Sequence, residues 1–240
     1  MSAEWILGAV IVAAASFVHG LAGFGIGLVS LAFLPFVMSP VTAVVLITIY
    51  TVAFSLGMLV PLRRDVQLRA LGLLAAGTVA GTPLGVYVLA RLPASVLTRL
   101  IGITLVVIVT LEWFGFYPER LSGRRWALGA GVAAGLAGGA VGTPGPPVIL
   151  YTASQGWSAR AVKATLQAFF LVNQAAIVLG YWWAGLITQD VWRAAVLFLA
   201  PATIALVLGV ALFNRVDQPT FRRIVFAVLF ASGVVLLIRG

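Results

Sequence analysis

Two glycine-rich stretches are the parts of this sequence best suited to bind a ligand with backbone groups. They run over Gly20–Gly27 and Gly135–Pro147, and the second contains Thr143. Glycine lets the backbone approach a ligand and proline removes a backbone donor, so neither stretch continues as one straight helix. A helix that begins after such a break points N–H groups and the positive end of its dipole at the gap. This chemistry suits a small anion.

The predicted anion-binding residues of the two stretches lie at the breaks themselves. They are Gly23, Phe24 and Gly25 in the first stretch and Gly142, Thr143 and Gly145 in the second. The alternative is that glycines only let membrane helices pack closely. We prefer that alternative for Gly77, Gly81 and Gly85, but not for the two breaks, because Pro-Gly-Pro-Pro is poor packing sequence.

His19, directly before the first break, is an ionisable side chain in an apolar stretch. Such a group is a candidate for function, and histidine exchanges a proton near neutral pH. The alternative is a neutral histidine bonded to a carbonyl that the break leaves free. Both readings stay open at this point.

Four further polar side chains are predicted to line a cavity. Gln167 and Gln174 are about two helical turns apart and share a face, whereas Asn173 is rotated from Gln174 by about 100°. Thr48 and Thr51 occupy the corresponding segment of the first half. The alternatives are interhelical hydrogen bonds for the amides and bonds within the helix for the hydroxyls.

The composition requires a membrane environment for these residues. Apolar residues make up 62% of 240 and charged residues 9%, with a mean hydropathy of +1.13, against about 25% charged in soluble domains. Soluble enzymes, nucleic-acid-binding modules and disordered proteins are excluded. The chain has no Cys and one His, so we expect no metal, no cofactor and no enzymatic activity. The net charge of +9 comes from short basic clusters, which are typical of cytoplasmic loops.

Charged and turn residues divide the chain into eight apolar blocks. They are Trp5–Met38, Val41–Val60, Ala70–Ala90, Leu100–Phe116, Trp126–Ser154, Ala161–Ile187, Val191–Phe213 and Ile224–Ile238. Most are close to the roughly 20 residues that a helix needs to cross a bilayer. The first and fifth are longer and contain the glycine breaks. We therefore predict an all-α integral membrane protein of about eight hydrophobic segments.

The two halves of the chain resemble each other. Gly-Leu-Ala-Gly occurs at Gly20–Gly23 and again at Gly135–Gly138, and Arg91–Arg99 matches Arg215–Arg223. The shared order of break, helices and basic loop indicates a duplication. We predict two repeats, residues 1–120 and 121–240, each opening with a glycine-broken hairpin or re-entrant segment.

The distribution of Lys and Arg favours inverted repeats. If both broken blocks are hairpins that enter and leave on one face, eleven basic residues share one side and four the other. Such an excess marks the cytoplasmic side. Each half then crosses three times, the halves insert in opposite senses, and both termini are periplasmic. One long crossing with a re-entrant piece would also account for the long blocks.

At the breaks the chain resembles the TauE/SafE sulfite exporters. The resembling residues are Gly20–Gly27 with Pro35, and Gly135–Pro147 continuing to Tyr151, Arg160–Thr165 and Gly180-Tyr181. The resemblance covers nearly the whole chain and implies a permease of the bacterial inner membrane that moves sulfite, organosulfonates or related anions. The family usually has glycine pairs where this chain has Thr143-Pro144-Gly145-Pro146, so the second tip is expected to be stiffer.

The predicted function is secondary transport, with export as the favoured direction, of a small sulfur oxyanion bound at the paired breaks near the bilayer midplane. One repeat would move against the other to alternate access. The alternatives are an anion channel or a non-transporting membrane scaffold. The expected partners are the small anion and the lipid bilayer, with no nucleic acid. The anion, the coupling ion and the oligomeric state, a homodimer included, stay open.

Overall fold

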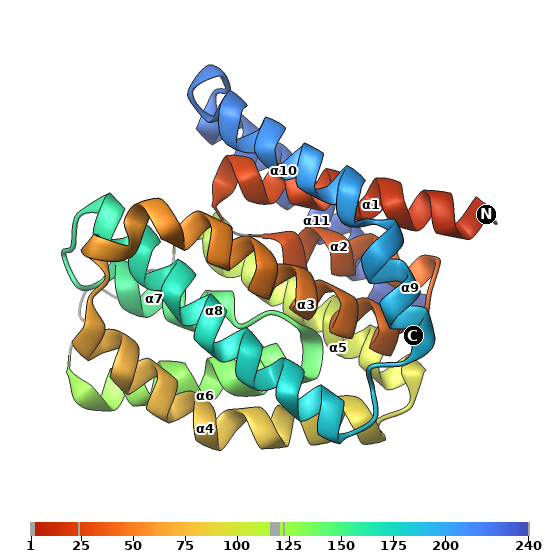
Figure 1. The fold of residues 1–240 in the computed structure, drawn as a ribbon, viewed down its shortest axis with the longest axis horizontal. Helices are drawn as coiled ribbons and strands as arrows, with labels where there is room; N and C mark the ends of the chain where they lie inside the picture. Colours follow the sequence, from red (N-terminus) through yellow and green to blue (C-terminus); the bar gives the residue numbers. More distant parts are fainter. Residues whose placement is uncertain (1–2, 24, 116–120, 122, 240) are drawn as a thin grey trace. The chain divides into compact units, whose positions relative to one another are not determined.

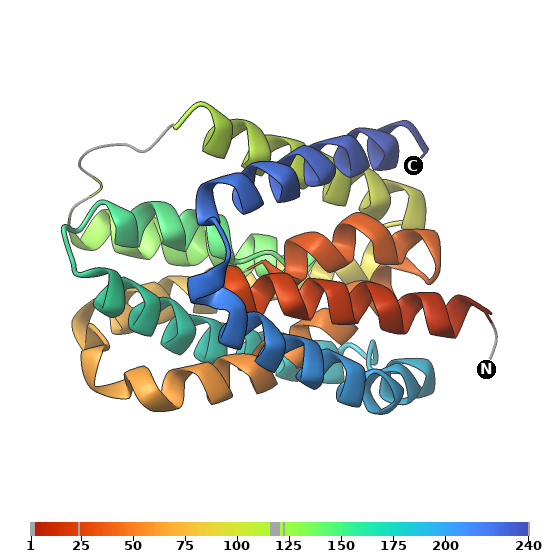
Figure 2. The ribbon, with the colours of Figure 1, turned by 90° about the horizontal axis from the view of Figure 1, so that it is seen from above.

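The protein is built from helices, as its composition predicted. The computed structural model describes residues 3–23, 25–115, 121 and 123–239, and this part of the chain contains no β-strand (Figures 1 and 2). The α-helices are α1 (Ala3–Ala22), α2 (Ile26–Phe33), α3 (Pro40–Leu59), α4 (Leu68–Arg91), α5 (Ala94–Trp113), α6 (Arg124–Val141), α7 (Gly145–Ala153), α8 (Ala159–Trp183), α9 (Gln189–Leu197), α10 (Leu199–Leu212) and α11 (Gln218–Arg239). Short 3-10 helices are η1 (Leu34–Phe36), η2 (Val60–Asp65) and η3 (Phe213–Arg215).

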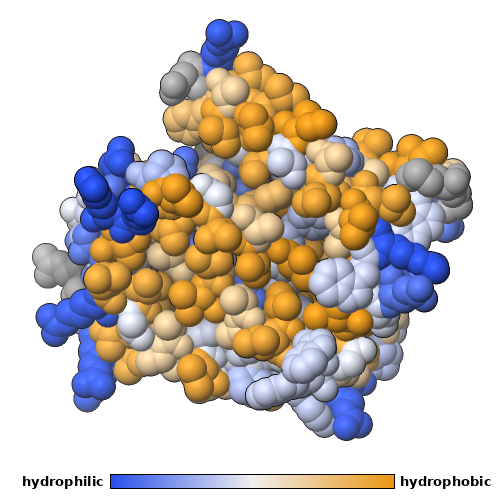
Figure 3. Space-filling model, in the orientation of Figure 1, coloured by the Kyte–Doolittle hydropathy of each residue, from blue (hydrophilic) through white to orange (hydrophobic). Residues whose placement is uncertain are grey.

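Several helices are long and apolar enough to cross a membrane. Within the described residues there are five, and six if α9 and α10, bent by 48° at their junction, form one span. Helices α2 and α7 have 8 and 9 residues, so at 1.5 Å per residue each is only about 12–14 Å long and cannot cross alone. Eight segments are therefore not confirmed. Hydrophobic side chains cover most of the face in Figure 3, as expected of a multi-pass membrane protein.

The chain divides into two compact units, and each contains parts of both sequence halves. The first unit comprises Met1–Ile47, Leu92–Gly115 and Ile187–Gly240. The second comprises Thr48–Arg91 and Phe116–Leu186. The division falls within α3, whose last three turns belong to the second unit. The first broken block lies in the first unit and the fifth block lies in the second.

Close packing at glycine holds the first unit together. Helix α1 packs along α10, and α5 packs along α11. A Cβ added at Gly20 would overlap the Leu206 carbonyl, and one at Gly209 would overlap the Phe17 carbonyl. The two backbones approach this closely because neither glycine has a side chain.

The second unit is built around a similar contact, between α4 and α6. Gly77, Gly81 and Gly85 each face the α6 backbone, and a Cβ at Gly81 would overlap the Val132 carbonyl. From the other side, a Cβ at Gly135 would lie 2.8 Å from the Thr78 carbonyl oxygen. The packing interpretation of the three α4 glycines is thus confirmed. It extends to Gly135, the first glycine of the second glycine-rich stretch.

Candidate functional site

Both long apolar blocks break at a glycine in the left-handed conformation. Gly23 follows α1 with φ 79° and Gly142 follows α6 with φ 67°. The Gly23 N–H donates to the His19 carbonyl at 2.7 Å, and the Gly142 N–H donates to the Gly138 carbonyl at 2.9 Å. These bonds end each helix in the usual way for a left-handed glycine cap. Neither block is one straight helix, as the sequence predicted.

The structural landmarks of the two broken blocks repeat at a constant interval. Gly142 follows Gly23 by 119 residues, α7 begins 119 residues after α2, and α8 begins 119 residues after α3. The matching Gly-Leu-Ala-Gly strings are only 115 residues apart. The second string therefore lies one helical turn earlier relative to its break, where Gly135 packs against α4 rather than forming the tip.

The second broken block is a hairpin whose two ends meet. The Gln155 side-chain amide, just after α7, donates to the Leu121 carbonyl, just before α6, at 2.8 Å. Ser154 adds a longer bond to the same carbonyl, at 3.4 Å. In Figure 2, α7 returns beside α6 toward the end where α6 begins. The chain thus enters and leaves this block at one end of the unit.

The tip of this hairpin lies about halfway along α8. A Cβ at Gly145, the first residue of α7, would lie 3.6 Å from the Phe170 ring. A Cβ at Gly138, one turn before the tip, would lie 3.2 Å from the Asn173 amide nitrogen. Phe170 and Asn173 are the twelfth and fifteenth of the 25 residues of α8. If α8 crosses the bilayer, the tip is therefore near mid-span.

Buried polar groups without hydrogen-bond partners gather around this tip. Thr143 is 5% exposed, and its hydroxyl has no partner within the described part of the chain. Asn173 and Gln174 are fully buried, and the Asn173 amide donates to Oε1 of Gln174 at 3.4 Å. Nε2 of Gln174 then has no acceptor among the described residues. A hydroxyl and a primary amide left this way are hydrogen-bond donors available to an anion.

Helix α7 contributes less to this site than its N-terminus predicts. Pro146 and Pro147 follow Gly145 directly and carry no N–H group. Backbone donation from the first turn of α7 is therefore largely limited to Gly145, and side chains supply the other donors. Among the described residues, no group of three or more His, Asp or Glu side chains is placed to hold a metal ion.

The first tip, in the other unit, has a different character. Gly25 caps α2 with φ 105° and has no atom within 4 Å of an added Cβ. A small cavity of about 20 Å³, enough for about one water molecule, lies beside it. Its lining is entirely apolar: Val18, Ala22, Gly25, Leu28, Val29, Phe221, Val225, Phe226 and Leu229. Predicted residue Phe24 lies outside the described residues, and His19 is buried in α1.

The other predicted cavity residues are buried in the second unit. Gln167, Thr48 and Thr51 are all less than 10% exposed. Thr48 is hydrogen-bonded to Tyr181, whose hydroxyl donates to the Gly139 carbonyl at 2.8 Å. Tyr181 thus fixes α8 against α6 just before the tip.

Asn173, which the rotation argument separates from Gln174, is buried close to the second tip. It was placed on a different face of α8 from Gln174, and that geometry holds. Helix α8, however, contacts α4, α6 and α7, so more than one of its faces is enclosed. Asn173 faces α6 at Gly138 and is fully buried.

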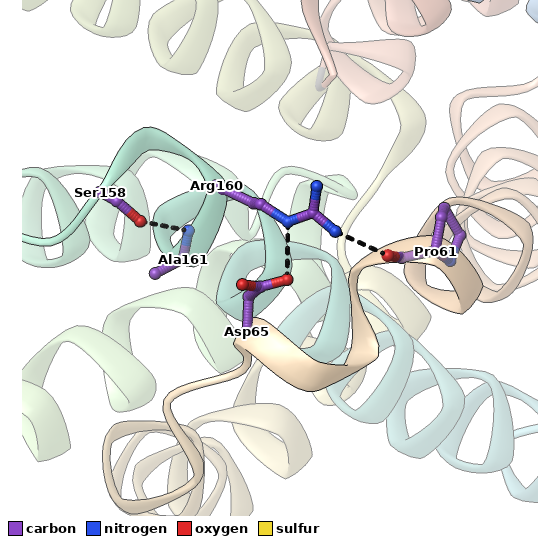
Figure 4. Close-up of polar contacts among 5 residues, drawn as sticks. All are labelled: Pro61, Asp65, Ser158, Arg160 and Ala161. Atoms are coloured by element: carbon purple, nitrogen blue, oxygen red, sulfur yellow. Dashed lines mark hydrogen bonds and ion pairs between the residues drawn. The ribbon is translucent and has the colours of Figure 1, made fainter.

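The hairpin end of the second unit carries basic residues and an ion pair between η2 and α8. Nε of Arg160 binds the Asp65 carboxylate at 2.7 Å, and its Nη2 donates to the Pro61 carbonyl at 3.2 Å (Figure 4). The Ser158 hydroxyl caps α8 by accepting from the Ala161 N–H at 3.2 Å. Arg160 is thus bound to η2 at the start of α8.

Comparison with known proteins agrees with the geometry. The sequence model of the family described as Sulfite exporter TauE/SafE matches residues 7–236, nearly the whole chain. No curated protein and no solved structure matches. This chain, a multi-pass helical protein with two glycine-broken apolar blocks, therefore belongs to the TauE/SafE sulfite exporter family.

Proposed function

We propose that the protein is a secondary transporter, in the export direction, of a small sulfur oxyanion such as sulfite or an organosulfonate. The family supports the substrate class. The observation that carries the site is the pair of buried donors at the second tip, the Thr143 hydroxyl and the Gln174 amide nitrogen, which have no partners among the described residues. Buried polar groups are normally hydrogen-bonded, and an anion supplies the acceptors that these donors lack.

Neutral donors suit a transporter because a ligand has to leave as well as bind. No Lys or Arg lies in the middle of any apolar block of the sequence, and none of the six acids does either. The site would therefore hold an anion by hydrogen bonds and the α7 dipole rather than by an ion pair. A cation would find no carboxylate there.

The architecture that we propose is two inverted repeats in the bacterial inner membrane, with both termini periplasmic. The 119-residue interval between landmarks supports the duplication. So do the helix pairs, since α1 packs on α10 in one unit and α6 packs on α4 in the other. We assign proton coupling, where it occurs, to buried His19. A His19→Gln variant would then transport without the pH dependence of the wild type.

The experiment is a thermal-shift titration of purified protein in detergent with sulfite, sulfate, thiosulfate and taurine. A ligand that binds only the folded state raises the midpoint as its concentration rises. We expect a saturable shift with sulfite or a sulfonate that Thr143→Val abolishes. Thr152→Val is the matched control, because this buried hydroxyl of α7 is bonded to the Val148 carbonyl at 2.9 Å and is not a free donor.

Two outcomes would reject parts of this proposal. A saturable shift from a cation, with none from any anion, would overturn the substrate class. Equal shifts in the wild type and in Thr143→Val would remove the site from the second tip. Saturation and counterflow in proteoliposomes separate a carrier from a channel, and a protein that binds no anion and carries no flux would be the scaffold.

A further inference from the structure

A row of buried polar side chains follows one face of α8, and another follows one face of α3. Gln167, Gln174 and Tyr181 are seven residues apart in turn, so they lie on one side of α8. Thr48 and Ser55 are likewise seven apart on α3, with Thr51 between them. All six are less than 10% exposed.

Two contacts show that α8 runs antiparallel to α3 and to the η2 segment that follows it. Near one end, Thr48 is hydrogen-bonded to Tyr181. At the other end, Arg160 at the start of α8 binds Asp65 and the Pro61 carbonyl, just after α3. Both contacts lie within the second unit. The N-terminal part of this α3 segment therefore lies against the C-terminal part of α8.

The register places Ser55 opposite Gln174. Ser55 is two turns after Thr48 on α3, and Gln174 is two turns before Tyr181 on α8. Seven residues rise about 10.5 Å along either helix. Starting from the Thr48–Tyr181 contact, Ser55 and Gln174 therefore reach the same level along the two helices, each on the side of its helix that carries the contact.

Ser55 has a hydroxyl without a partner at this level. Buried serines and threonines in helices usually donate to the carbonyl four residues earlier, as Ser16 does to Val12 at 2.7 Å and Thr78 does to Leu74 at 3.0 Å. The Ser55 hydroxyl makes no such bond and has no other partner in the described chain. Nε2 of Gln174, at the same level, has none either.

We infer that Ser55 is a further anion-binding residue, whose hydroxyl donates together with the Gln174 amide to one oxyanion. The inference rests on the proposed function and extends its site from the second tip and α8 to α3. Three neutral donors then come from three different segments: Thr143 from the tip between α6 and α7, Gln174 from α8 and Ser55 from α3. An anion with several oxygens accepts from all three at once, whereas a halide has a single acceptor atom.

The test compares Ser55→Thr with Ser55→Val, because the two side chains have nearly the same shape and differ in the hydroxyl. Sulfite affinity is measured by calorimetric titration of purified protein, and the thermal midpoint verifies folding. We expect Ser55→Thr to bind as the wild type does and Ser55→Val to bind about tenfold more weakly, as for one hydrogen bond to a charged group. Ser16→Ala, which removes a hydroxyl bonded within its own helix, leaves the affinity unchanged.

The results separate this inference from the proposed function. If Gln174→Leu weakens sulfite binding while Ser55→Val and Ser55→Thr bind equally well, Ser55 is not a ligand and the site at the second tip stands. If the wild type binds no sulfur oxyanion, both fail. Should both Ser55 variants unfold, Ser55→Ala and Ser55→Gly, which remove atoms without adding any, give the same comparison against wild type.

Discussion

The tips of the two broken blocks share a backbone design but differ in the chemistry that surrounds them. Each follows a helix capped by a left-handed glycine, Gly23 or Gly142, and each precedes a short helix. Beside the first tip lies a small cavity lined only by apolar residues. Beside the second, Thr143 and Gln174 present buried donors without partners among the described residues.

We propose that the two tips differ in role although they share a backbone design. At the first tip, an added side chain at Gly25 would meet no atom within 4 Å, so space does not require a glycine there. Its φ of 105° does, because other residues rarely adopt this conformation. In the second, prolines fix the turn and remove N–H donors, and side chains from α8 supply polar groups instead. We therefore propose that the anion binds at the second tip.

The largest expected effect concerns the close helix packing at glycine that both units share. Gly20→Val in α1 and Gly81→Val in α4 each drive a side chain into a facing backbone carbonyl. We expect each substitution to lower the free energy of unfolding by about 3 kcal/mol or more, which is enough to prevent folding. Gly72→Val is the control, because Gly72 is also on α4 and has no atom within 4 Å of an added Cβ. Fluorescence-detected size exclusion measures the folded fraction, and a monodisperse Gly81→Val protein would contradict the packing account.

The next effect separates the tips by ligand binding. Gln174→Leu removes a buried donor at the second tip, and we expect sulfite binding to weaken by about 10- to 100-fold, the range for a hydrogen bond to a charged group. The thermal midpoint without ligand should change little, because the substitution removes the unpartnered Nε2 together with the long 3.4 Å bond that Oε1 accepts from Asn173. Calorimetric titration measures the affinity. Unchanged affinity would remove Gln174 from the site.

A smaller effect distinguishes the two tips by backbone strain. Gly25→Ala places a side chain at φ 105°, which costs about 1–2 kcal/mol. Gly145→Ala is expected to be nearly neutral, because its added Cβ has no atom closer than 3.6 Å and its φ is not left-handed. Thermal midpoints of the two variants make the comparison. Equal falls in the thermal midpoint of the two variants would show that backbone conformation at these glycines does not distinguish the tips.

The smallest effect concerns the hairpin end of the second unit. The Arg160 and Asp65 side chains are 63% and 34% exposed, so their ion pair is worth about 0–1 kcal/mol and is screened by salt. Asp65→Asn should lower the thermal midpoint slightly at low salt and not at high salt. A large, salt-independent loss would mean that η2 depends on this contact more than its exposure indicates.

Much of the architecture could be predicted from the sequence, because hydropathy and glycine act locally. The two broken blocks were identified from Gly and Pro alone, since these residues end helices without help from distant contacts. The bend between α9 and α10 could also have been expected. Pro201 has no N–H for the Leu197 carbonyl four residues earlier, and α9 ends at Leu197.

The site was predictable only in part, because it depends on tertiary contacts. Thr143 and Gln174 were identified from residue type and position in an apolar block. The sequence does not single out Ser55, which we propose as a ligand, although it lies seven residues from Thr48, because serine is common in helices and is usually bonded within them. The face argument separated Asn173 from Gln174, and it does not foresee a helix enclosed on several sides.

Proteoliposome flux of labelled sulfite tests the central claim most directly. Two variants are compared with the wild type at equal folded amounts, Thr143→Val/Gln174→Leu at the second tip and Leu28→Ala/Val29→Ala in the apolar lining of the first. We predict that the second-tip variant loses sulfite transport and that the first-tip variant retains it. Transport lost in the first-tip variant and kept in the second-tip variant would contradict the account.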